Sequence, residues 1–115
     1  MSKERKNEDM AGYGYEFEDL TPGTILECTW GWSMTIVDFY RVVGRWGKAH
    51  VSLEKLEKKV VDGDGMVGRC VPDCGKVIDH ITNVFYSKKY KALKLDKNRI
   101  LSIWNGRPCY HNYFD

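Results

Sequence analysis

The segment at residues 35–43 constrains the fold more than any other part of the sequence. It reads TIVDFYRVV, where β-branched and aromatic residues crowd together without a glycine or proline. Such residues favour extended backbone. Their apolar side chains occupy consecutive as well as alternate positions, so both faces of the predicted strand must be covered. We therefore expect residues 35–43 to form a central strand of a sheet.

Strand patterns also occur on both sides of this segment. Apolar and polar residues alternate at 24–30 and again at 48–53, which is typical of strands with one buried face. Three further short segments, rich in β-branched or aromatic residues, predict strands at 66–71, 99–104 and 109–114.

Turn residues separate these segments. Pro22-Gly23, the DGDG sequence at 62–65 and Asn105-Gly106 each favour a change of chain direction. Short strands that recur about every eight to twelve residues are typical of all-β domains. We therefore predict an all-β fold, a small antiparallel barrel of the SH3-like kind or a sandwich, with at most one short helix.

The segment at residues 52–60 fits two structures. Its leucines and Val60 have helical spacing, and Ser52 is a suitable N-cap. The alternation that precedes the segment, however, continues into it without a breaker. We prefer a strand that continues to about Val61, with a helix as the alternative, and we expect a loop at residues 72–80.

Charge is distributed unevenly along the chain. Residues 1–20 contain three basic and six acidic residues, a net charge of −3, and are expected to form a flexible arm before a single β-rich domain at 21–115. Residues 76–99 contain seven basic and two acidic residues, a net charge of +5. The whole chain carries only +2, which predicts weak affinity for free nucleic acid.

The basic segment contains aromatic residues among its lysines. Positive charge interleaved with aromatic rings is a footprint suited to a phosphate backbone. A solvated lysine-rich edge that discourages strand aggregation, and attraction to the acidic arm, explain the same pattern. The candidate binding residues in this segment are Tyr86, Lys88, Lys89, Tyr90, Lys91 and Lys94.

Two tryptophans are further candidate binding residues. Trp32 and Trp46 lie in glycine-containing corners, where we expect them to be partly exposed. In contrast, Trp30, Phe39 and Trp104 are expected to fill the core.

An acidic residue, Asp38, interrupts the predicted central strand. A buried carboxylate requires a partner. We expect Asp38 to pair with Arg41 or Arg45, or to cap a turn.

The cysteines and histidines do not form a recognisable catalytic or metal site. The C-x3-C spacing of Cys70 and Cys74 and the C-x-H spacing of Cys109 and His111 depart from zinc signatures. The remaining Cys28, His50 and His80 are isolated in sequence. We expect reduced thiols, no metal, no cofactor and no enzymatic activity.

The string WGWSMTIVDFYRVV at residues 30–43 resembles a motif, WG-aromatic-x-x-T-x-x-DFY-x-VV, of small uncharacterised accessory proteins of bacteriophages, prophages and plasmids. The resemblance continues at VSLE (51–54), GRCVP (68–72) and WNGRP (104–108) and covers residues 22–113. Asn105 replaces the aspartate that is more usual there, and members generally lack cysteines at positions 70 and 74. The family brings no established catalytic residues.

The resemblance implies a mobile genetic element, whose accessory proteins often inhibit host defence systems such as CRISPR nucleases. The leading hypothesis is a non-enzymatic protein that occludes a host protein, with a defence nuclease as the specific candidate. The alternative is a nucleic-acid-binding SH3-like module that uses the lysine-rich patch. No apolar run is long enough to cross a membrane, and the first ten residues contain no signal-peptide core, so we expect a cytoplasmic protein in a bacterial host.

Overall fold

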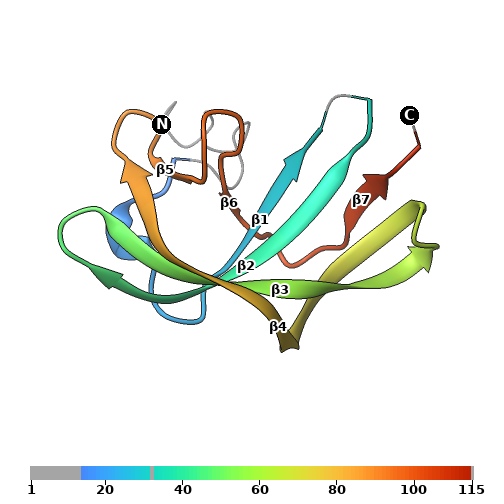
Figure 1. The fold of residues 1–115 in the computed structure, drawn as a ribbon, viewed down its shortest axis with the longest axis horizontal. Coiled ribbons are helices and arrows are strands. Elements are labelled where there is room, and N and C mark those ends of the chain that lie inside the picture. The colour runs from blue at the N-terminus through green and yellow to red at the C-terminus, as the bar shows by residue number, and fades with distance from the viewer. Residues whose placement is uncertain (1–13, 32, 115) are drawn as a thin grey trace, which may run out of the picture.

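The computed structural model describes residues 14–31 and 33–114, and this part of the chain is built almost entirely of β-strands (Figure 1). It contains no α-helix, and its one helical turn is the 3-10 helix η1 (Phe17–Asp19). The all-β prediction is confirmed. The strands are β1 (Ile25–Trp30), β2 (Ile36–Trp46), β3 (His50–Gly63), β4 (Val67–Ser87), β5 (Ala92–Lys94), β6 (Ser102–Ile103) and β7 (Cys109–Asn112).

All strand pairs are antiparallel, in the order β5-β4-β3-β2-β1-β6, and β7 pairs with the beginning of β4. Two isolated bridges make the sheet nearly close on itself. Lys94, at the end of β5, pairs with Ile100 shortly before β6, and Asn112 of β7 pairs with Thr35 shortly before β2. The result is a barrel-like sheet that curls at both ends.

Each curled end forms a lobe. The first lobe contains β5, β6 and the parts of β1–β4 beside them, and the second lobe contains β7, the hairpin between β3 and β4, and the beginning of β2 (Figure 1). The long strands β3 and β4 run through both lobes.

The two lobes have separate cores on opposite faces of β2. Tyr40 and Val42 belong to the first core, whereas Val37 and Phe39 belong to the second. Because successive side chains of a strand point to opposite faces, β2 is covered on both sides, as the consecutive apolar residues at 35–43 predict.

The segment at residues 52–60 lies in β3, so the preferred strand is confirmed and the helix is wrong. The predicted loop at 72–80 is also wrong, because β4 continues through Pro72. Leu56 and Glu57 are consecutive in β3, but their partners in β4 are Val77 and Asp73. The β4 residues 74–76 therefore have no partner in β3 and form a bulge. The Arg41 Nη1 donates to the carbonyl of Cys74 in that bulge over 2.9 Å, and β4 bends sharply there (Figure 1).

The expected boundary between arm and domain at residue 20 needs correction. Tyr15 and Leu20 are buried in the first core. The Tyr15 hydroxyl donates to the carbonyl of Leu101 over 2.8 Å and accepts from the amide of Leu93 over 2.7 Å. Residues 14–20 therefore belong to the barrel, and the rest of the predicted arm lies outside the described residues.

Candidate binding surface

One row of side chains crosses the outer face of the first lobe. In the strand registers Trp46 lies opposite His50, His50 opposite Phe85, and Phe85 opposite Lys94. Directly opposed residues point to the same face of a sheet. These side chains, here called the outer row, are Trp46 of β2, His50 of β3, Phe85 of β4 and Lys94 of β5.

The rings of the outer row are held in place and remain accessible. The Trp46 indole stacks on His50 with 4.5 Å between centroids and 17° between planes, and Phe85 meets His50 edge-on at 6.1 Å. The Trp46 Nε1 donates to the carbonyl of Thr82 over 3.3 Å, and His50 Nδ1 lies 2.8 Å from the Asn83 side-chain oxygen. Trp46 is nonetheless 48% exposed and Phe85 53% exposed.

The basic end of the outer row lies at the turn between β4 and β5, residues 88–91. Tyr90 in this turn is 45% exposed, with the Lys94 Nζ 4.6 Å and the Lys89 Nζ 5.5 Å from its ring centroid. Lys91 pairs with Glu16 at 3.1 Å. Within the described part of the chain, Lys88, Lys89 and Lys94 have no carboxylate at ion-pair distance. The predicted attraction between the acidic and basic segments is therefore present as the Lys91–Glu16 ion pair. Among the described residues, the other three lysines are not neutralised by such a pair.

The structure gathers four of the predicted binding residues, Trp46, Lys89, Tyr90 and Lys94, at this surface, whereas Lys88 lines a pocket with Glu16 and Glu18. Lys91 belongs to the same turn but faces Glu16, and Trp32 lies outside the described residues.

Tyr86 does not belong to the surface, which corrects its prediction as a binding residue. It is 3% exposed, and its hydroxyl donates to the carbonyl of Tyr15. Strand alternation places its neighbour Phe85 on the outer face instead. The sequence analysis did not identify Phe85 and His50 as binding residues. Once residues around 85 are known to form a strand, alternation places the side chain of Phe85 on the face opposite to that of Tyr86.

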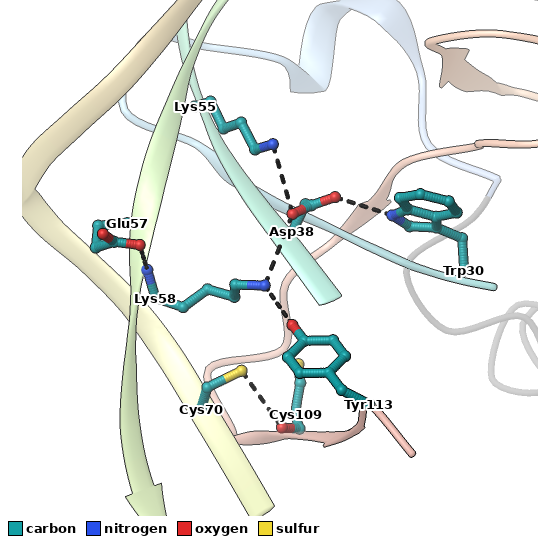
Figure 2. A network of polar contacts seen from close by, with 8 residues as sticks. All are labelled: Trp30, Asp38, Lys55, Glu57, Lys58, Cys70, Cys109 and Tyr113. Carbon is teal, nitrogen blue, oxygen red and sulfur yellow. Dashed lines mark hydrogen bonds and ion pairs between the residues drawn. The ribbon is translucent and has the colours of Figure 1, made fainter. Parts of the chain in front are cut away.

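A second polar cluster surrounds Asp38 in the second lobe (Figure 2). Asp38 is 6% exposed, and its Oδ2 accepts from Trp30 Nε1 over 2.9 Å. Its Oδ1 lies 3.6 Å from Lys55 Nζ and 3.9 Å from Lys58 Nζ, and Lys58 also donates to the Tyr113 hydroxyl over 2.5 Å. Both carboxylate oxygens are therefore occupied, and the cluster joins three strands to the C-terminal segment.

The predicted arginine partners of Asp38 are wrong. Arg41 pairs with Glu54 at 2.8 Å, and the Arg45 guanidinium lies over the Phe17 ring at 5.3 Å. Lysines from β3 reach Asp38 instead, because the registers place β3 beside β2.

The tryptophans expected in the core lie at its margins. Phe39 is fully buried, as predicted, and Trp104 meets it edge-on at 6.0 Å while remaining partly exposed. Trp30 is also only partly buried and packs against the first core.

A groove of about 910 Å³ lies beside Trp30. Gly31 in its wall has a φ of +123°, and a Cβ there would approach the Met34 carbonyl oxygen to 2.2 Å, which explains the glycine of the WG pair. The Arg99 guanidinium lies 5.3 Å from the Trp30 ring centre and pairs with Asp96 at 2.7 Å. The two charged groups of the groove thus neutralise each other.

All four cysteines are free thiols. Burial raises the pKa of the Cys28 and Cys109 thiols to about 12. Cys70 of β4 and Cys109 of β7 lie opposite each other in the strand register, without a bond between their sulfur atoms. Within residues 14–31 and 33–114, no three His, Cys, Asp or Glu side chains lie close enough together to hold a metal ion.

Comparison with known proteins finds no matching family model, no similar curated protein and no similar solved structure. None of the described segments forms a helix of the length and apolarity needed to cross a membrane.

Proposed function

We propose that the protein is a non-enzymatic binding protein of a phage or other mobile element, which inhibits a host defence system by occluding a host protein. A defence nuclease of the CRISPR type is the candidate partner. The biological setting rests on the resemblance of residues 30–43 to mobile-element accessory proteins. The contact surface rests on the outer row.

The single observation that carries the proposal is the exposure of Trp46 and Phe85 on one face of the sheet, on either side of His50. Tryptophan, tyrosine and arginine are the residues that most often dominate binding energy at interfaces. Trp46 is already held by His50 and by the carbonyl of Thr82, so a partner does not have to immobilise it. A ring that is ordered before binding loses little conformational entropy in the complex.

The polar groups of the described residues support binding rather than chemistry. The Asp38 carboxylate is fully used by Trp30 and two lysines. The raised pKa of the Cys28 and Cys109 thiols makes them poor nucleophiles at neutral pH.

The test is capture of a partner from a nuclease-treated lysate of the bacterial host. Immobilised wild-type protein should retain a host protein that the double variant Trp46→Ala/Phe85→Ala loses. Tyr110→Ala is the matched control, because Tyr110 is 52% exposed but lies on β7 in the second lobe. The purified partner should then lose activity at about one equivalent of wild-type protein. Full activity of every captured protein in the presence of saturating wild-type protein would contradict the proposal.

A further inference from the structure

We infer that the outer row, together with the turn at residues 88–91, binds single-stranded nucleic acid. The inference rests on the proposed function in taking the outer row as the binding face, and it names the ligand of that face.

The first argument is the spacing of the rings. Trp46, His50 and Phe85 come from three adjacent strands, which lie about 4.8 Å apart in a sheet. Two of the three rings are about half exposed. Proteins that bind single strands without sequence preference present aromatic rings of this kind, because every base has a π-face that can stack.

The second argument is the position of the positive charge. Lys94 ends the outer row, and Lys88 and Lys89 follow in the adjoining turn. Lys48, in the turn between β2 and β3, lines a pocket with Lys88 and Lys91 and does not extend the row. Lysines therefore stand at one end of the row of rings, where a backbone that continues beyond the stacked bases would place phosphates.

The third argument is the separation of opposite charges. The net charge of +2 predicts little affinity for polyanions only if the charges are mixed. In the structure Glu16 pairs with Lys91, whereas Lys88, Lys89 and Lys94 have no ion-pair partner among the described residues. The charge that remains available is concentrated beside the exposed Tyr90 ring.

These features favour a single strand over a duplex or an acidic peptide. The bases of a duplex are stacked on one another and do not offer their faces to protein rings. An acidic peptide would use the lysines but not the row of rings. Only an unpaired strand offers both exposed base faces and phosphates, which matches a row of rings that ends at lysines.

The experiment measures fluorescence anisotropy of a labelled 15-nucleotide oligo-dT, with the oligo-dT·oligo-dA duplex as comparison. We expect a Kd of about 1–100 μM near 0.15 M salt, the range of sequence-independent binding, and weaker binding to the duplex. If about three lysines contact phosphates, log K should fall with log salt at a slope of about −2, since each contact on a single strand contributes about −0.7.

Two kinds of variant separate the ring and charge contributions. Phe85→Ala should weaken binding about 5- to 150-fold, the loss expected when one stacked base loses its ring. The double variant Lys89→Glu/Lys94→Glu should bring the salt slope to about −0.7 or shallower. Tyr110→Ala and Lys76→Glu, which change exposed residues away from the outer row, are the controls and should bind as wild type does.

Equal affinity for strand and duplex, or wild-type affinity in Phe85→Ala, would overturn the inference. Capture of a host protein by a wild-type chain that does not bind the oligonucleotide would also overturn it while leaving the proposed function intact. Oligonucleotide binding with these variant effects, but without any captured protein, would support the inference and contradict the proposed function. Phe85 is an exposed residue, so its substitution tests binding without threatening the fold.

Discussion

The two lobes of the barrel are stabilised in different ways. Among the residues that the structure describes, the first core contains thirteen buried residues, including Leu20, Leu53 and Leu101, whereas the second contains four: Val37, Phe39, Leu56 and Cys70. The second lobe adds a polar cluster around the nearly buried Asp38. Apolar burial therefore dominates the stability of the first lobe, and directed polar contacts contribute more to the second.

The difference explains where exposed rings are tolerated. The inner face of β3 and β4 in the first lobe packs Val51, Val84 and Tyr86 into a closed core. The outer face of the sheet is then free to expose Trp46 of β2 and Phe85 of β4 without cost to the packing. A sheet that is packed in this way on its inner face is a suitable base for a binding surface.

The sharpest test of the comparison uses two leucines of β3, each 1% exposed and each in a different core. Leu53→Ala should destabilise the protein by about 3–5 kcal/mol, because the large first core cannot collapse around the cavity. Leu56→Ala should cost about 2–3 kcal/mol, because the small second core lies near polar groups and can relax. Urea unfolding measures both, and a larger loss for Leu56→Ala would reverse the ranking of the lobes.

The polar cluster provides the next largest effect. Asp38→Asn keeps an acceptor for Trp30 but leaves Lys55 and Lys58 without a counter-charge. We expect a loss of about 1–2 kcal/mol, below the usual value for a buried pair because both lysine side chains are about one third exposed.

The control for this substitution is Glu54→Gln, which removes the ion pair with Arg41 and should cost less than about 1 kcal/mol. Thermal unfolding of both variants at one salt concentration makes the comparison. Equal losses would mean that the Asp38 cluster stabilises the second lobe no more than a surface ion pair does.

Thiol labelling tests whether the smaller core opens first. At pH 8 in native buffer, Cys74 should react rapidly with N-ethylmaleimide because it is exposed. Cys28, Cys70 and Cys109 should react slowly, because burial raises the pKa of each thiol. In mild denaturant, mass spectrometry should detect Cys70 and Cys109 labelled before Cys28, and the opposite order would place the weaker lobe on the Cys28 side.

The fold could be predicted from the sequence wherever local pattern and burial agree. The crowded apolar residues at 35–43 and the alternation at 24–30 and 48–53 each correspond to strands. The bulge in β4 was not predictable, because Pro72 and Gly75 indicate a break locally. Pairing along β3 overrides that local preference.

The candidate surface was predictable only in composition. The lysines and Tyr90 follow from the basic segment, but the inclusion of Phe85 and His50 depends on which residues lie opposite one another in β3 and β4. If the register of β4 against β3 shifted by one residue, Tyr86 would take the place of Phe85 on the outer face. The same is true of Asp38, whose lysine partners come from a neighbouring strand rather than from its own.

The smallest expected effect distinguishes one exposed carboxylate in each lobe. In the second lobe, Asp64 accepts from the amides of Val67 and Met66, and these bonds lower its pKa below the ordinary value for aspartate. In the first lobe, the hydrogen bond from the Arg99 side chain is the main cause of the lowered pKa of Asp96, followed by the amide of Asn98.

A carboxyl group with a lowered folded-state pKa stabilises the fold above its unfolded-state pKa, near 4, and loses that contribution as the pH falls through the folded-state value. Both turns should therefore weaken only below about pH 4. Salt should separate them: raising it to about 1 M screens an exposed ion pair but leaves amide hydrogen bonds largely intact. NMR titration should show the pKa of Asp96 rising with salt while that of Asp64 stays nearly constant. Equal shifts for the two carboxyl groups would mean that Arg99 contributes no more through its charge than the backbone amides do.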